Sequence, residues 1–240
     1  MNVWRERAEQ SPKDSVDSLR QVLDPLDFKG LKNLYIDYYF KYYICKHLRP
    51  NPVDVLFEIG CGRGRLSEYL ASFVSHVYGV DLIDHFIAIC KENPQKKPNT
   101  TYFNLSDLHP LEDVNKCFTV GVLMYFENDE SLIQTLKTYQ SFLPHAGSFY
   151  FLEQCEQQTK NKTLEGDFYA RYRTVKDYRR LFAKAGLRIS RLTVMGERTY
   201  GPCLNALLRY NFVYQRLPKA LHRIIPGLFH IDRFLLSLGR

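Results

Sequence analysis

The chain has 240 residues, of which 45% are hydrophobic and 25% charged. This composition predicts one globular domain with room for an appendage and excludes a disordered or fibrous chain. The formal net charge of +7 permits an anionic partner without naming one.

The apolar segments, the N-terminus and the cysteines of the chain bear on its location in the cell. The sequence has no apolar run of about 18 residues, so we expect no spanning helix. The charged N-terminus lacks an apolar segment, so we expect no signal peptide. Six cysteines are scattered without a C-x-x-C pair or a metal-ligand cluster. They indicate reduced thiols in a cytoplasmic protein with no bound metal.

The first 50 residues predict a helical cap. A short helix is expected to start at Ser11-Pro12, because proline is favoured in the first turn of a helix. A second helix, unusually rich in tyrosine, is expected over Leu31–Leu48. Tyr38 and Tyr42 on this helix have two interpretations, since a phenol suits both. They either pack the helix on the domain or bind substrate as part of a lid.

Residues 53–70 predict a buried strand, a tight turn and the start of a helix. A short apolar run precedes Gly60, Gly62 and Gly64, which stand at alternate positions. Such a turn needs residues without a Cβ, both for unusual dihedral angles and for close approach of a ligand. The N–H groups at the helix start would then face an anionic group of that ligand. A dinucleotide fingerprint would require glycine or alanine where Arg65 stands.

Acidic residues follow each of the next two expected strands. The strand 77–81 ends on Asp81, where nucleoside-binding α/β folds place a carboxylate that accepts the ribose hydroxyls. Leu82 would flank an adenine ring. After a helix over 83–93, the strand 101–107 ends on Asp107.

The pattern Glu58-x-Gly60-x-Gly62-x-Gly64, with the two strand-end acids, resembles the class I S-adenosylmethionine-dependent methyltransferases of the small-molecule type. The resemblance covers about residues 53–194. It implies an α/β fold with an open, mainly parallel Rossmann-like sheet and helices on both faces. It also implies that the glycine turn cradles the methionine part of S-adenosylmethionine, that Glu58 orients its ammonium group, and that Asp107 accepts from the adenine amino group. The cofactor-binding residues expected on this basis are Glu58, Gly60, Cys61, Gly62, Gly64, Asp81, Leu82, Ser106, Asp107, Leu108 and Leu123.

The second half of the expected domain continues the alternation of strands and helices, without a visible seventh strand. Asn128 and Thr174 are expected to cap two of its helices. The expected elements are a strand over 117–123, a helix over 130–142, a strand over 148–152, a polar loop over 155–170, a helix over 172–186 and a sixth strand over 187–194.

Three side chains are candidates for handling the proton of the acceptor or orienting it. Tyr125 follows the fourth strand, at a place where the family often has histidine. Glu153 ends the fifth strand and reads equally well as a solvated helix cap. His109 lies between Asp107 and Pro110, and a surface histidine is the simpler interpretation.

Residues 201–240 carry six basic residues against Asp232 alone, which is a net charge of +5. Apolar residues fill the spaces between them, and Pro218 and Pro226 are expected to divide the segment into short helices. Basic groups over apolar faces are typical of interfacial membrane helices. The alternative is a helical appendage that packs on the domain.

We therefore expect three parts: a helical cap over 1–50, a methyltransferase domain over 51–200 and a basic amphipathic tail over 201–240. The expected activity is methyl transfer to a small-molecule, sugar-like or glycan-like acceptor at a hydroxyl or carboxyl group, in the cytoplasm and, if the tail binds lipid, beside a membrane surface. No specific nucleic acid is expected, because the Asn/Asp-Pro-Pro-aromatic motif of nucleic-acid amino methylases is missing after the fourth strand. A cofactor-binding subunit without transfer activity, or a protein or nucleic-acid methyltransferase, stays open as an alternative.

Overall fold

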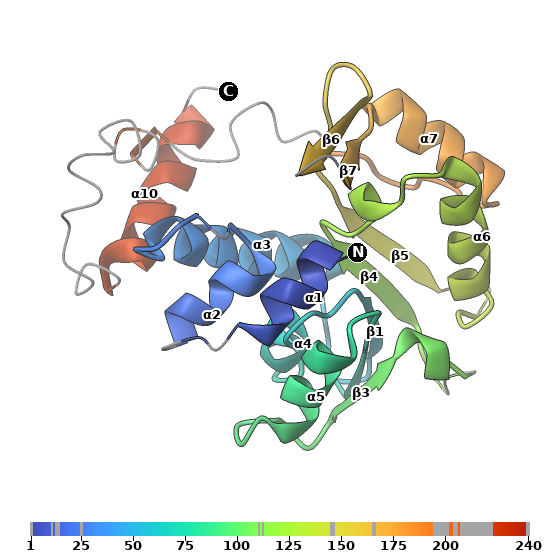
Figure 1. Cartoon of the computed structure of the whole chain (residues 1–240), viewed down its shortest axis with the longest axis horizontal. Helices are drawn as coiled ribbons and strands as arrows, with labels where there is room; N and C mark the ends of the chain where they lie inside the picture. The colour runs from blue at the N-terminus through green and yellow to red at the C-terminus, as the bar shows by residue number, and fades with distance from the viewer. Residues whose placement is uncertain are drawn as a thin grey trace. The chain divides into compact units, whose positions relative to one another are not determined.

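A computed structural model describes residues 2–10, 12, 15–24, 26–109, 111, 113–144, 147–164, 167–193, 202–203, 206 and 223–238. The chain divides into two compact units (Figure 1). The sheet unit comprises residues 1–8 and 47–191, and the helical unit comprises residues 9–46 and 192–240.

The sheet unit is built on five parallel strands in the order β3-β2-β1-β4-β5. The chain reverses its direction of winding between β1 and β4, which is the switch point where open α/β sheets bind ligands. The strands are β1 (Val55–Ile59), β2 (His76–Asp81), β3 (Thr100–Asn104), β4 (Lys116–Val120) and β5 (Ser148–Leu152). The predicted parallel α/β sheet is thus confirmed.

Helices cover both faces of this sheet, as predicted (Figure 1). Successive side chains of a strand point to opposite faces. In β1, Phe57 packs edge-on against Tyr139 of α6, at 5.7 Å between ring centroids. The next residue, Glu58, instead bonds Ser67 of α4 on the other face. The helices of this unit are α1 (Asn2–Glu9), α4 (Arg65–Leu70), α5 (Asp84–Glu92), α6 (Asp129–Gln140) and α7 (Val175–Lys184), with short 3-10 turns η1 (Leu105–Asp107) and η2 (Leu123–Tyr125).

Several boundaries differ from the sequence predictions. The predicted polar loop over 155–170 is wrong, because β6 (Lys160–Leu164) and β7 (Asp167–Tyr172) form an antiparallel hairpin there. The first of these strands, KNKTL, lacks the alternation of apolar residues that would have revealed it. Helix α1 was not predicted at all, since its sequence is mostly polar.

The predicted sixth strand is also wrong over residues 187–193, which form neither strand nor helix. Ile189 and Leu192 stay exposed there. The third strand ends at Asn104 rather than Asp107, and the helix that the glycine turn begins ends at Leu70. Asn128 and Thr174 cap α6 and α7 as predicted.

The described part of the helical unit contains α2 (Ser15–Val22), most of α3 (Leu31–Leu48) and α10 (Ile225–Leu238). Phe229 of α10 is buried between two tyrosines of α3. Its ring lies 5.4 Å from Tyr35 and 5.5 Å from Tyr42, between centroids. Pro226 stands in the first turn of α10, where proline is tolerated. Pro218 lies outside the described residues.

Candidate functional site

The glycine turn lies between β1 and α4. Gly60, Gly62 and Gly64 have φ values of +73°, +53° and +74°, in the left-handed region that favours glycine. The backbone N–H groups of Gly60 and Cys61 both donate to the carbonyl of Val80, at 2.8 and 2.9 Å. The turn is therefore attached to the end of β2.

Two glycines of this turn also lack the space for a side chain. A Cβ on Gly60 would stand 2.5 Å from Cγ2 of Val122, and a Cβ on Gly64 would stand 2.7 Å from the phenol oxygen of Tyr102. Tyr102 is fixed in place, because it donates a 2.7 Å hydrogen bond to Glu68. The turn is thus packed against its neighbours on both sides.

Glu58 lies beneath the turn. It is buried and accepts a hydrogen bond from the hydroxyl of Ser67 in α4. Burial raises the pKa of Glu58 to about 8, so the carboxyl group holds a proton at neutral pH. Its hydrogen bond with Ser67 connects β1 to α4, and a direct role toward the ammonium group of the cofactor stays a prediction.

Asp81 ends β2 beside the turn. One carboxylate oxygen accepts from the N–H of Gly62 at 2.9 Å, and the other accepts from the N–H of Ile83 at 3.0 Å. Each oxygen keeps a second lone pair, so the carboxylate can still accept from a ribose diol. Leu82, next in the chain, is 50% exposed and presents an apolar surface at the predicted adenine position.

Asn104 is a residue that sequence analysis missed. It is paired with Asp81 across β2 and β3 and is buried. Its amide donates to Oδ1 of Asp84 at 2.5 Å, and its oxygen accepts from the N–H of Ser106 at 2.8 Å. Asn104 therefore fixes both segments predicted to flank the adenine. The feature that could have identified Asn104 is its pairing with Asp81 in the register of β2 and β3.

The predicted adenine contacts Ser106, Asp107 and Leu108 follow on η1 and just beyond it. Ser106 and Asp107 are exposed and Leu108 is half-buried. Cys61 is buried behind the turn, where Cys90 of α5 also contacts the carbonyl of Gly62 at 3.3 Å. All these groups lie at the carboxyl ends of β1, β2 and β3.

The edge of the sheet at β4 carries Tyr125, the last residue of η2. Burial raises the pKa of Tyr125, and the nearby phenol of Tyr169 raises it further. The phenol therefore stays protonated at neutral pH and can donate a hydrogen bond. Tyr125 is also within three residues of Val122, which packs on Gly60. The predicted cofactor residue Leu123 is buried at the start of the same turn.

Glu153 accepts hydrogen bonds from the backbone at the start of η2. One of its oxygens accepts from the N–H groups of Val122 and Leu123 at 3.0 and 3.1 Å. Burial raises the pKa of Glu153 to about 7. The structure thus gives Glu153 a role in positioning the loop of Tyr125, while a direct role in proton transfer stays a prediction.

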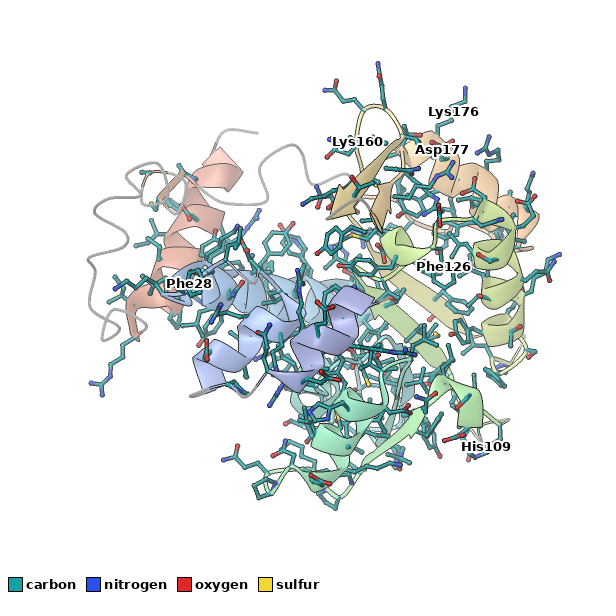
Figure 2. All side chains as sticks on the ribbon, viewed as in Figure 1. Phe28, His109, Phe126, Lys160, Lys176 and Asp177 are labelled. Carbon is teal, nitrogen blue, oxygen red and sulfur yellow. The ribbon has the colours of Figure 1, made fainter. Side chains whose placement is uncertain are left out.

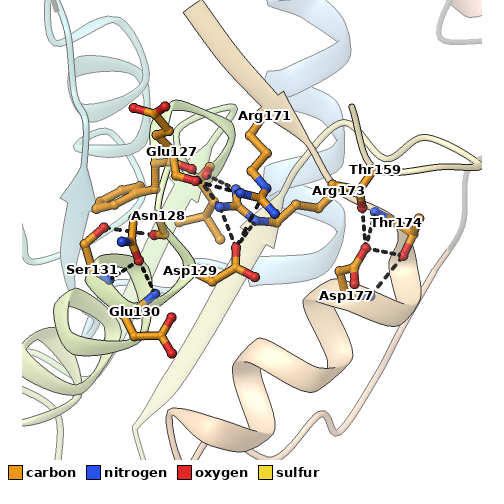
Figure 3. A network of polar contacts seen from close by, with 12 residues as sticks. Glu127, Asn128, Asp129, Glu130, Ser131, Thr159, Arg171, Arg173, Thr174 and Asp177 are labelled. Atoms are coloured by element: carbon orange, nitrogen blue, oxygen red, sulfur yellow. Dashed lines mark hydrogen bonds and ion pairs between the residues drawn. The ribbon is translucent and has the colours of Figure 1, made fainter. Parts of the chain in front are cut away.

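Arg173 was not singled out from the sequence, yet it organises this edge (Figure 3). It is 1% exposed and donates to the carbonyl oxygens of Leu123 and Phe126 at 2.9 and 2.6 Å. The same guanidinium group bonds Asp129 at 2.9 Å. Arg173 follows β7 directly, so it joins the hairpin, η2 and the start of α6.

His109 is not brought to Tyr125. His109 is exposed, with its Nδ1 3.2 Å from the carbonyl of Asp107. Figure 2 shows His109 well apart from Phe126, the residue after Tyr125. Tyr38 and Tyr42 belong to the helical unit, where Tyr42 packs on Phe229. Their predicted role as a lid stays a prediction.

Comparison with known proteins agrees with this geometry. Residues 57–140 match a family model described as a methyltransferase domain. A curated relative, the probable cobalt-precorrin-6B C(15)-methyltransferase (decarboxylating) of Archaeoglobus fulgidus, is 46% identical over 35 residues. That match covers 15% of this chain and only 22% of the relative.

Solved structures show the same fold at low identity. A SAM-dependent methyltransferase of Leishmania major aligns with a TM-score of 0.58 and 18% identity, over 81% of this chain and 77% of that one. Phosphoethanolamine N-methyltransferase 1 of Haemonchus contortus aligns at 0.51 with 20% identity, over 72% of this chain and 41% of that one. Magnesium protoporphyrin IX methyltransferase of Synechocystis aligns at 0.50 with 16% identity, over 83% and 86%.

The crowding at Gly64 can be separated from its backbone conformation. Gly64→Ala should lower the free energy of unfolding by about 1–2 kcal/mol for the left-handed φ and by about 1–3 kcal/mol more for the clash with Tyr102. Gly186→Ala is the control, because Gly186 has φ +81° and its nearest neighbour would be 3.7 Å away. Urea unfolding measures both. Equal losses for the two variants would show that crowding at the turn is unimportant.

The buried arginine allows a second comparison. Arg173→Lys should lower the free energy of unfolding by about 3–5 kcal/mol, because an ammonium group cannot reach Leu123, Phe126 and Asp129 together. Arg180→Lys changes an exposed partner of the same Asp129, at 3.4 Å, and should cost at most about 1 kcal/mol. Thermal and urea unfolding test the difference. A small effect of Arg173→Lys would mean that η2 does not depend on this contact.

Proposed function

We propose that the protein is a methyltransferase of the class I type that transfers a methyl group from S-adenosylmethionine to a small-molecule acceptor, because residues 57–140 match a methyltransferase-domain model. The acceptor atom is a hydroxyl or carboxyl oxygen of a sugar-like or other small molecule. The observation that supports the proposal most is the attachment of the glycine turn to Asp81 through Gly62.

The residues of the sheet edge fit S-adenosylmethionine. Each carboxylate oxygen of Asp81 accepts one backbone N–H, so the group keeps acceptor capacity for two hydroxyl groups of a ribose. The cofactor supplies an electrophilic methyl group on its sulfonium, so the protein mainly has to orient the acceptor and handle its proton. We assign to Tyr125 the orientation of the acceptor as a hydrogen-bond donor, and its raised pKa, which keeps the phenol protonated, supports this role.

Removal of the Asp81 carboxylate tests cofactor binding. Asp81→Ala should weaken the binding of S-adenosylmethionine and of its demethylated product by about 1.5–3 kcal/mol, since the ribose loses a charged acceptor. Glu92→Ala, an exposed acid at the end of α5, should leave the affinity unchanged. Isothermal calorimetry measures the affinity, and circular dichroism checks that the Asp81 variant is folded.

The same preparation separates the alternatives. Incubation with labelled S-adenosylmethionine and cell extract, followed by mass spectrometry, should yield a methylated small molecule. A labelled protein or nucleic acid would contradict the proposed acceptor class, and binding without any labelled product would indicate a cofactor-binding subunit. Binding of a nicotinamide dinucleotide with none of S-adenosylmethionine would contradict the proposal as a whole.

A peripheral membrane contact of the C-terminal segment belongs to the same proposal. Among the described residues, none of the helices has the length and apolar character needed to cross a bilayer. One side of α10 is buried through Ile225 and Phe229, whereas Ile231 and Phe234 on the helix, and Ile224 just before it, are exposed. With the net charge of +5 over residues 201–240, this exposed apolar side suits an anionic lipid surface.

The membrane contact predicts salt-dependent sedimentation. The protein should sediment with phosphatidylserine vesicles at low salt and be released as salt rises, because each basic residue contributes about 1 kcal/mol near the surface. A variant with Ile231→Ser and Phe234→Ser should lose sedimentation. Phe73→Ser, at an exposed phenylalanine of the sheet unit, should keep it. If the unmodified protein ignores these vesicles, the membrane contact is ruled out.

A further inference from the structure

An aromatic and basic cluster surrounds Tyr125 on the sheet unit. We define it as Trp4 and Arg7 of α1, Tyr125 of η2, and Lys162 and Tyr169 of the β6–β7 hairpin. The ring of Trp4 meets that of Tyr125 edge-on at 5.0 Å between centroids, and Tyr125 meets Tyr169 at 6.0 Å. Three segments that are far apart in the sequence thus converge on one phenol.

The cluster is positioned next to the proposed cofactor site. Tyr125 closes the turn that Val122 begins, and Val122 occupies the space beside Gly60. Glu153 accepts from the N–H group of Val122, and Arg173 donates to the carbonyl of Leu123, so both side chains hold the backbone of this turn. Side chains that contact Tyr125 therefore border the end of the sheet at which the methyl group would be presented.

The charged groups that lie on these rings are cations. The guanidinium of Arg7 lies 4.7 Å from the ring centroid of Trp4 and 5.7 Å from that of Tyr169. The ammonium of Lys162 also lies over the Tyr169 ring, 5.2 Å from its centroid. Lys160, labelled on the hairpin in Figure 2, lies 5.9 Å from the neighbouring ring of Tyr172 and also pairs with Glu156. An amine acceptor would meet like charge here, whereas an anion would be attracted.

The cluster also contains a buried hydrogen-bond donor for which the described residues supply no acceptor. The indole Nε1 of Trp4 is buried, and among the described residues it has no hydrogen-bond partner. A buried donor without a partner is unfavourable, and an oxygen of a ligand would relieve it. The phenol of Tyr125, whose ring contacts both Trp4 and Tyr169, is a second hydrogen-bond donor in the cluster.

We propose that the aromatic and basic cluster binds an oxyanion group, carboxylate or phosphate, of a methyl acceptor that has a flat or apolar body. The rings of Trp4, Tyr125 and Tyr169 contact the body, and Arg7 and Lys162 pair with the oxyanion. The identity of the bound molecule as the acceptor rests on the proposed function, but the binding of an oxyanion does not.

Trp4 is the only tryptophan of the chain, so its fluorescence reports on this cluster alone. The full-length protein is titrated with benzoate, phenyl phosphate, benzamide and benzylamine, with emission excited at a wavelength selective for tryptophan. Benzoate or phenyl phosphate should change the emission saturably, with at least about tenfold higher affinity than benzamide or benzylamine. The stronger of the two anions then distinguishes a carboxylate from a phosphate group.

Variants connect the binding to the proposed residues. Arg7→Gln should remove the preference for the anion over benzamide, and Arg7→Lys should keep most of it. Lys162→Gln, on an exposed side chain of the hairpin, should weaken anion binding several-fold without risk to the fold. Lys176→Gln is the control, because Lys176 is exposed on α7 (Figure 2).

The outcomes separate this inference from the proposed function. Tighter binding of benzylamine than of benzoate, or anion binding that survives both Arg7→Gln and Lys162→Gln, would overturn the inference. Calorimetry with S-adenosylmethionine runs in parallel. If the cofactor binds and no anion does, only the oxyanion site fails; if the anion binds and the cofactor does not, only the proposed methyl transfer fails.

Discussion

The guanidinium of Arg173 is the contact on which the η2 segment and its Tyr125 depend. It is buried, and it donates at once to two carbonyl oxygens of the η2 segment and to the carboxylate of Asp129. A buried cation is costly unless it is paired and fully hydrogen-bonded, and here the partners come from two further parts of the chain. The arginine therefore sets the position of Tyr125 relative to the hairpin that carries Tyr169.

The glycine turn predicted to hold the cofactor depends on close packing rather than on charge. The left-handed glycines bring the turn against Val122 and Tyr102, and Asp81 accepts from the turn's own backbone. Two buried acids support the two sides: Glu58 under the turn and Glu153 under η2, with pKa values raised by burial to about 8 and about 7. Glu58 bonds α4 and Glu153 bonds the backbone of η2, so each acid holds neighbouring segments together. Because these two acids support the segments, other residues of the site are left to contact ligands.

Val122 joins the two sides. Its side chain fills the space beside Gly60, and its N–H group donates to Glu153. Through this one residue, the turn predicted to hold the cofactor and the turn predicted to face the acceptor share a boundary. The aromatic and basic cluster around Tyr125 then adds groups from α1 and from the hairpin to the turn predicted to face the acceptor.

The errors of sequence analysis have a common physical cause. The β6–β7 hairpin was predicted as a loop because its first strand is exposed and polar, so no burial pattern marks it. Residues 187–193 were predicted as a strand because apolar residues follow the glycine stop of α7, yet Ile189 and Leu192 stay exposed. The pattern of apolar residues in a segment predicts whether the segment is buried as a strand. Whether it is buried in fact depends on the presence of a neighbouring strand, which the pattern does not record.

The sequence by itself determined the local units of this protein. The strand, glycine turn and helix of residues 55–70, the strand-end Asp81, and the caps Asn128 and Thr174 each follow from residues close together in the chain. The tertiary structure alone decided which distant groups meet: Arg173 with η2, Asn104 with Asp84, and Trp4 and Arg7 with Tyr125 and Tyr169. Such contacts join residues many positions apart, and no local propensity or periodicity records which of the possible partners will be brought together by the packing of the sheet and its helices.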